Sequence, residues 1–283
     1  MRLIYTLMLV GVTAVWGWTF VVVQDAIIAY SVLGFLSLRF LLAAAALAPF
    51  LASRMTLRTL LAGGSIGSVL AAGYLFQTLG LLYTTPTNSG LITGLFVVFA
   101  PLTAWIFFKA GIPRPVLLAI LLSLSGMVLL AGQSASLGRV GDALTVLCAA
   151  GIGAHIALLS RYAPSHDAGA LALSQMFSMG LIFTMLWPVF EPVELPPREV
   201  WFAILLTGLV ASAGAYYVQT TVQQRISAAR AAIILTMEPV FAAIFGFWLA
   251  GDRLSPIQLF GGVLILSALF VGEVLPVLRR RGK

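Results

Sequence analysis

The stretch IILTMEPVFAAIFGFWLAG, residues 233–251, is a hydrophobic run about as long as a lipid bilayer is thick. Glu238 and Pro239 stand side by side near its middle. At lipid depth, a carboxyl group and a residue that interrupts helical hydrogen bonding are tolerated only where they face protein or water. This run therefore predicts a membrane-spanning helix with one side turned toward a polar interior.

Similar runs recur along all 283 residues, of which 61% are hydrophobic and only 9% are charged. A water-soluble domain of this length could not bury so much apolar surface in one core. Runs of about 20 residues with few charges indicate helices, because the strands of a membrane barrel are shorter and alternate in polarity. The composition thus predicts an all-α integral membrane protein.

Ten transmembrane helices are expected when the chain is divided at charges, prolines and glycines. With the N-terminus in the cytoplasm, most of the 16 Lys and Arg residues fall between spans on the cytoplasmic side, in agreement with the positive-inside rule. We therefore expect a multi-pass protein with both termini in the cytoplasm. The expected spans are residues 3–23, 31–51, 59–82, 86–107, 114–132, 142–161, 168–188, 200–222, 228–250 and 255–277.

The net charge of +7 comes from basic residues that are scattered between the spans instead of gathered in one patch. We therefore expect no nucleic-acid partner. The expected partners are the lipid bilayer and a small-molecule substrate, and the expected oligomeric state is a monomer.

The second half of the chain repeats the first half weakly but in the same order. For example, YLFQTLGLLYTTPTNSGLI (residues 74–92) aligns with YYVQTTVQQRISAARAAII (residues 216–234). The expected repeats are residues 1–133 and 139–283, and the odd number of five helices in each repeat forces the second one to insert inverted. Two inverted repeats around a central site are typical of transporters. The alignment pairs Gln77 with Gln219, Pro101 with Pro239, Trp18 with His155, and Arg39 with Gln175.

Three motifs resemble those of the EamA-type permeases of the drug/metabolite transporter superfamily. They are AVWGWTFVVVQ at residues 14–24, LRFLLAA at residues 38–44, and MEPVFAAIFGFWLAGDRLSPIQLFGGVLILSALFV at residues 237–271. The resemblance implies ten helices and export of amino acids, aromatic ones included, or other small metabolites across a bacterial inner membrane. The chain departs from the family pattern at Asp252, where Glu is usual, and at Gly153, where the second repeat usually has Trp.

Arg39 and Glu238 are the leading candidates for a binding site. Both are expected near the middle of the bilayer, where an isolated charge costs roughly 2.5–3.5 kcal/mol. Protonation of the acid or a cationic neighbour would offset this cost. We expect the two side chains to face the same interior space, where they either pair directly or bind the two ends of a zwitterionic substrate. The alternative is a structural contact that locks two helices together.

Other intramembrane residues could complete the site. Amides add hydrogen-bonding capacity, and aromatic rings could wall a pocket for an apolar or aromatic substrate, although both types also serve helix packing. His155 titrates near neutral pH and could couple transport to protons or simply bond a neighbouring helix. Pro101 and Pro239 each remove a backbone donor and are expected to act as hinges. The remaining substrate-binding candidates are Trp16, Trp18, Tyr74, Gln77, Asn88, Trp105, Gln175, Tyr216 and Gln219.

No Walker loop, zinc-binding spacing, catalytic triad or nucleotide-binding glycine motif occurs in the sequence. We therefore expect no cofactor, no metal and no enzymatic activity. The predicted function is secondary transport by alternating access. An intramembrane enzyme and a channel are the alternatives, although a channel usually arranges rings of like groups around an oligomer axis.

Overall fold

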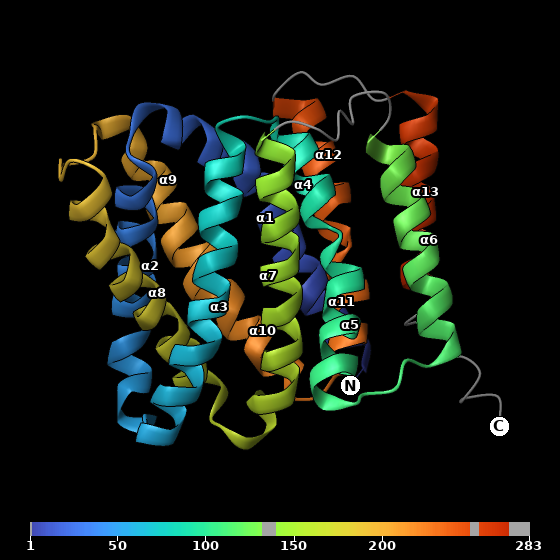
Figure 1. Cartoon of the computed structure of the whole chain (residues 1–283), viewed down its shortest axis with the longest axis horizontal. Coiled ribbons are helices and arrows are strands. Elements are labelled where there is room, and N and C mark those ends of the chain that lie inside the picture. The colour runs from blue at the N-terminus through green and yellow to red at the C-terminus, as the bar shows by residue number, and fades with distance from the viewer. Residues whose placement is uncertain (1, 132–139, 250–254, 272–283) are drawn as a thin grey trace.

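The computed structural model describes residues 2–131, 140–249 and 255–271, and these parts of the chain are helical, with no strand among them (Figure 1). The first half contains α1 (Arg2–Ala29), α2 (Val32–Leu51), the 3-10 turn η1 (Ala52–Arg54), α3 (Leu57–Leu81), α4 (Pro86–Thr93), α5 (Phe96–Phe108) and α6 (Arg114–Ala131). The second half contains α7 (Val140–Tyr162), η3 (Ala163–Ser165), α8 (Ala168–Phe190), η4 (Arg198–Val200), α9 (Trp201–Leu205), the π-helical segment η5 (Leu206–Gly214), α10 (Ala215–Gln223), α11 (Ala228–Leu235), α12 (Met237–Leu249) and α13 (Pro256–Leu269). The prediction of an all-helical protein is confirmed.

Eight segments of the described chain are long and apolar enough to cross a membrane. They comprise α1, α2 with η1, α3, α4 with α5, α7 with η3, α8, the run from η4 to α10, and α11 with α12. The apolar parts of α6 and α13 are shorter, at Arg114–Leu129 and Pro256–Ala268. Eight of the ten expected spans are thus confirmed. The fifth and tenth stay predictions, and the predicted end of the tenth lies outside the described residues.

Polar residues directly before several apolar runs fix where the helices begin. Ser31, Thr56, Thr85 and Asp167 precede α2, α3, α4 and α8, and the side-chain oxygen of each accepts a hydrogen bond from a backbone N–H three residues later. Such caps satisfy donors that the first helical turn leaves without a partner. The loop residues therefore set the helix bounds as firmly as the apolar runs do.

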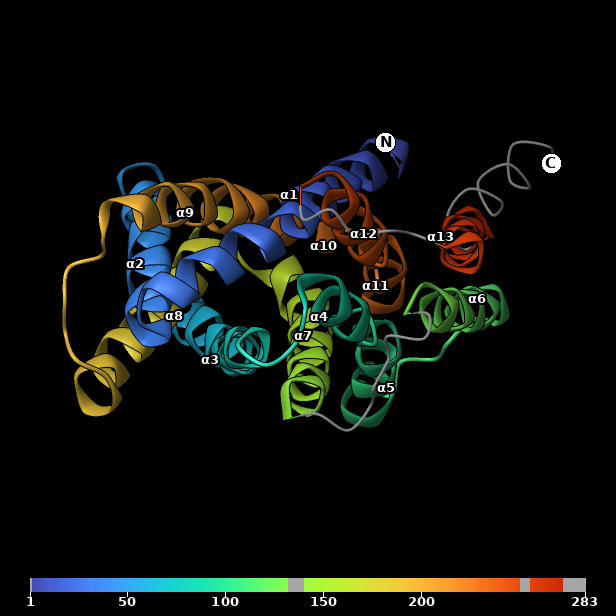
Figure 2. The same cartoon turned by 90° about the horizontal axis from the view of Figure 1, so that it is seen from above.

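Successive spans run antiparallel, so that the connections after α2, α5, α7 and α10 lie at the end of the bundle where the N-terminus lies (Figure 1). Arg54, Lys109 and Arg225 belong to these connections. The connection between α8 and η4, at the other end, carries Glu191 and Glu194. Viewed from above, α6 and α13 pack together at one edge, beside the remaining helices (Figure 2).

Corresponding helices of the two halves pack in a matching way. α1 packs on α12 and α7 packs on α5. A Cβ atom on Gly17 would lie 2.6 Å from the Cβ of Phe241, and one on Gly153 would lie 2.5 Å from the Cβ of Phe99. Only glycine permits these close approaches, because real Cβ atoms keep more than about 3 Å from such neighbours. The two crossings therefore depend on equivalent glycines, Gly17 and Gly153.

The helix bounds revise one predicted pairing between the halves. A helix breaks after Thr93, between α4 and α5, and again after Leu235, between α11 and α12. These breaks are 142 residues apart, as are Tyr74 and Tyr216. Pro239 follows its break at once, in the first turn of α12, whereas Pro101 lies inside α5. The predicted pairing of the two prolines is therefore wrong, because the breaks and not the prolines are equivalent.

The pairing of Trp18 with His155 is also wrong by one residue. The close crossings place Gly17 opposite Gly153, and this register sets Thr19 opposite His155. A single-residue shift rotates a helical position by about 100°. The side chain that matches His155 therefore points in a different direction from Trp18.

Candidate functional site

A cavity lies among the helices at the level of the two breaks, and polar and aromatic side chains from both halves wall it. The cavity has a volume of about 30 Å³, enough for no more than a few water molecules. An amino acid cannot enter unless the walls move apart. The lining residues are Trp16, Thr19, Phe20, Val23, Arg39, Tyr74, Gln77, Leu81, Phe96, Ile152, His155, Tyr216, Gln219, Leu235 and Glu238.

Eight of the twelve predicted binding residues line this cavity. They come from six separate helices, so the fold brings together side chains that are far apart in the sequence. The eight are Trp16, Arg39, Tyr74, Gln77, His155, Tyr216, Gln219 and Glu238.

The other four predicted residues lie elsewhere. Trp105 is 56% exposed on the outside of the bundle, and Trp18 packs against two phenylalanine rings away from the cavity. Asn88 donates a hydrogen bond to Asp142. Gln175 lies behind the cavity wall. Aromatic and amide side chains also serve lipid contact and helix packing, and their positions in the sequence do not separate these roles.

The sequence prediction missed several lining residues, most of them apolar. Thr19, Phe20 and Val23 follow Trp16 at spacings of three, four and seven residues, which places all four on one face of α1. This periodicity is the signal that could have found them. They were missed because an apolar side chain shows no chemistry of its own until its neighbours are known.

Equivalent residues of the two halves meet inside the cavity wall. The hydroxyl of Tyr216 donates to that of Tyr74 over 2.9 Å, and the two tyrosines occupy matching positions in α10 and α3. The Trp16 ring lies 5.2 Å from the Tyr216 ring, and its Nε1 donates to the carbonyl oxygen of Ala211 over 2.8 Å. Because their polar atoms have partners, these rings form a well-ordered wall.

Arg39 is only 3% exposed and is held by neutral groups. Its Nε donates to Ser212 Oγ over 2.8 Å, and one terminal nitrogen donates to the Tyr74 hydroxyl over 3.3 Å. The guanidinium carbon lies 4.7 Å from the centre of the Tyr74 ring and 5.0 Å from that of Phe40. A guanidinium group has five N–H donors, so donors remain for a ligand in the cavity.

Glu238 lacks a comparable set of partners. Its side chain is 6% exposed, and no hydrogen bond or ion pair joins its carboxyl group to the described parts of the chain. Direct pairing of Arg39 with Glu238, one of the two arrangements expected from the sequence, is therefore not found, because Ser212 and aromatic rings hold the guanidinium instead. A buried carboxyl group without a partner is unfavourable, and the binding of a cation or proton relieves this cost. The Oε1 atom of Gln219 is likewise buried without a hydrogen-bond partner.

His155 forms a hydrogen bond to the neighbouring helix α8, which is one of the two roles expected from the sequence. Its Nε2 lies 2.8 Å from Gln175 Oε1, and the Gln175 amide nitrogen donates to Leu171 O over 3.2 Å. The ring also meets the edge of Tyr216, with the ring centres 5.8 Å apart. This arrangement fixes the imidazole in the wall of the cavity.

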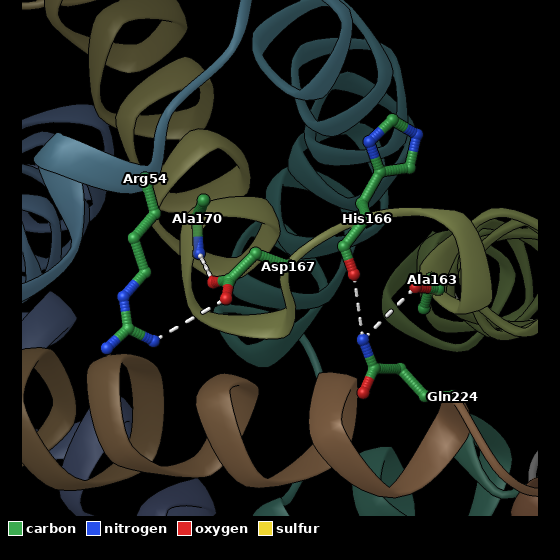
Figure 3. Close-up of polar contacts among 6 residues, drawn as sticks. All are labelled: Arg54, Ala163, His166, Asp167, Ala170 and Gln224. Atoms are coloured by element: carbon green, nitrogen blue, oxygen red, sulfur yellow. Dashed lines mark hydrogen bonds and ion pairs between the residues drawn. The ribbon is translucent and has the colours of Figure 1, made fainter.

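Polar contacts also connect three inter-helix loops at the N-terminal end of the bundle (Figure 3). Arg54 forms an ion pair with Asp167 over 3.5 Å, and Asp167 caps α8 through the backbone N–H of Ala170. Gln224 donates to the carbonyl oxygens of Ala163 and His166 over 3.2 and 2.8 Å. These contacts hold the α7–α8 connection to its neighbours.

Acidification is expected to weaken this end of the bundle. Partial burial, and then the nearby Arg58 charge, lower the pKa of His166 below its ordinary value of 6.5. As the pH falls below that value, the unfolded chain takes up the proton before the native one does, and stability falls. Between pH 7.5 and pH 5, the unfolding temperature in detergent should fall less for His166→Asn than for the parent. The effect is expected to be modest because His166 is only partly buried, and an equal loss in both proteins would contradict it.

Eight membrane-crossing segments around a buried polar cavity define a multi-pass membrane protein of the transporter class. The chain belongs to the EamA-like transporter family, whose model matches residues 3–132 and 139–272. The resemblance noted in the sequence is thus confirmed.

Two relatives are described as transporters, and one solved structure shares the fold. An uncharacterized transporter of Archaeoglobus fulgidus is 34% identical over 95% of this chain and 86% of its own length. The uncharacterized transporter YwfM of Bacillus subtilis is 26% identical over 69% of each chain. A crystal structure with 18% identity superposes with a TM-score of 0.79 over 97% of this chain and 99% of that chain, which shows a shared fold.

Proposed function

We propose that this protein is a secondary transporter that exports zwitterionic amino acids, or closely related metabolites, across the bacterial inner membrane. One observation carries the proposal. A buried arginine with unused donors and a buried carboxylate without a partner line the same cavity but do not pair with each other. Two opposite charges kept apart in this way match a ligand with an anionic and a cationic end.

The cavity chemistry assigns a role to each wall. The carboxylate of an amino acid would accept hydrogen bonds from Arg39, in the planar geometry that guanidinium groups favour. Its ammonium group would donate to Glu238, whose carboxyl group makes no hydrogen bond within the described chain, and to Gln219 Oε1, which is buried without a partner. The Trp16 and Phe20 rings would contact the side chain, so substrates with apolar or aromatic side chains are favoured.

Alternating access accounts for the small volume of the cavity. The matching packing of α1 on α12 and of α7 on α5 supports two inverted repeats, which can rock about the central site. The basic residues at the N-terminal end of the bundle support a cytoplasmic location for that end. In this conformation the walls leave little free space between them, and transport requires them to part on one side at a time.

Purified protein in liposomes provides the test. Uptake of a panel of amino acids, with and without a pH gradient, should saturate and should be accelerated by unlabelled substrate on the opposite side. Apolar and aromatic zwitterions should be transported at least about tenfold faster than their amides or decarboxylated amines, each of which lacks one charged end. Flux that does not saturate would indicate a channel, chemical change of the substrate would indicate an enzyme, and equal transport of the single-charge analogues would contradict the assigned substrate class.

A further inference from the structure

We infer that the side-chain amides of Gln24 and Gln223 act as latches, which means that their hydrogen bonds hold the cavity closed toward the two membrane faces, one residue at each face. Each residue must release its hydrogen bonds when the cavity opens on its side. The inference rests on the proposed function only in its use of alternating access. It does not depend on the identity of the substrate.

The first latch lies at the end of the bundle opposite the N-terminus. Gln24 directly follows Val23, which lines the cavity, and its amide nitrogen donates to the carbonyl oxygens of Leu81 and Thr84, each over 3.0 Å. Leu81 also lines the cavity and ends α3, where the carbonyl groups have no partner within the helix. The amide of Gln24 therefore bridges α1 and α3 immediately beyond the cavity.

The second latch occupies the matching place at the other end. Gln223 ends α10, as Leu81 ends α3, and the two residues are 142 positions apart, the separation of Tyr74 and Tyr216. Its amide nitrogen donates to the Ile156 carbonyl oxygen over 2.9 Å and to Ser160 Oγ over 2.6 Å, both on α7. Ser160 holds the position in α7 that Gln24 holds in α1, by the register of Gly17 and Gly153. Corresponding pairs of helices are thus tied at the two ends, α1 with α3 at one and α7 with α10 at the other. The donor lies on α1 in the first pair but on α10, the counterpart of α3, in the second.

The two ends are not tied equally. At the N-terminal end, Gln224 adds hydrogen bonds to two carbonyl oxygens of the α7–α8 connection (Figure 3). At the opposite end, the Gln24 amide is the side-chain bridge between α1 and α3 within the described chain. Thr84 also donates to Asp142 over 3.0 Å, which fixes the α3–α4 turn to α7. With that turn fixed, opening at this end separates α1 from α3.

Ordinary structural ties between helices would hold the same atoms together without a role in opening, and site-directed labelling separates the two cases. Thr19→Cys places a reporter thiol in the cavity wall, in a Cys148→Ser background that removes the native cysteine. A membrane-impermeant maleimide is applied to either face of sealed vesicles of known orientation. Gln24→Leu should increase the labelling rate at least threefold from the face opposite the N-terminus. Gln223→Leu should increase it from the N-terminal face and decrease it from the other.

Gln258→Leu is the matched control, because it makes the same substitution at the start of α13, and its labelling rates should equal those of the parent. Gln24→Asn and Gln223→Asn, which keep the amide but shorten its reach, serve where a leucine variant does not fold. Unchanged labelling in folded variants at both positions, or an increase at the same face in both, overturns the inference. If the labelling changes as expected while no amino acid is transported, the proposed substrate class fails and the latches stand. If transport occurs but labelling does not respond, the latches fail.

Discussion

Glu238→Gln and Arg39→Gln should each reduce transport at least about thirtyfold, measured as the initial uptake rate in liposomes. Removal of one partner from a buried charge interaction costs roughly 2–5 kcal/mol, and every 1.4 kcal/mol corresponds to about a factor of ten. Glutamine is nearly the size of glutamate, so the first change removes the negative charge with little change in packing. A substrate ammonium group would then lack its charged partner in the cavity.

The two variants are expected to differ in stability. Glu238→Gln replaces a buried carboxyl group that has no partner in the described chain with an amide of similar size, so its unfolding temperature in detergent should be unchanged or higher. Arg39→Gln loses the hydrogen bond to Ser212 and the contact with two rings, and its unfolding temperature should fall. Glu199→Gln and Arg198→Gln make the same substitutions at exposed positions and should transport normally. Intact transport in both cavity variants would end the proposed role of this pair.

Gly17→Ala and Gly153→Ala are expected to destabilise the folded protein by about 1–3 kcal/mol, the usual cost of overpacking. The nearest atoms to the added Cβ include backbone atoms at 2.7 Å for Gly17 and 2.9 Å for Gly153, and backbone atoms cannot swing aside as the end of a side chain can. The helix crossing itself must shift in both variants. Unfolding temperature and the fraction of monodisperse protein in detergent measure this loss.

Gly11→Ala and Gly64→Ala are the matched controls for this prediction. A Cβ atom at either position meets nothing within 4 Å. Alanine is favoured over glycine in a helix by up to about 1 kcal/mol, so these variants should be as stable as the parent or more so. Equal stability of the four variants would show that the helices that cross at Gly17 and Gly153 can move apart without loss of stability, which would contradict the prediction.

The sequence predicted the spans well because hydrophobicity along the chain is a one-dimensional property. It could not predict which way each helix is rotated within the bundle. Trp16 and Trp105 are the same residue type in equally apolar surroundings, yet one lines the cavity and the other is 56% exposed. Rotation is decided by packing, here by close crossings at Gly17 and Gly153.

Charge was a better guide to the site than aromaticity. Arg39 and Glu238 are unfavourable at lipid depth, and this cost alone required an interior location. Their lack of direct contact could not be predicted, because it depends on the Ser212 hydroxyl and the Tyr74 ring, which come from other parts of the chain. The equivalent helix breaks escaped detection for a different reason: the residues that follow them, Gly94 and Thr236, are chemically unlike, whereas the visible prolines are not equivalent.

The charges of the cavity are divided between the two halves of the chain. Arg39 comes from the first half, and Gln175 stands at its counterpart; Glu238 comes from the second, and the register of the helix breaks places Phe96 at its counterpart. A homodimer assembled from either half alone would therefore carry two arginines or two glutamates in its cavity, and it could not bind both charged ends of one zwitterion. If the halves descend from a duplicated ancestor, they have diverged so far that one cannot replace the other. When the chain is expressed as two fragments, transport should be restored only when the first half and the second half are present together.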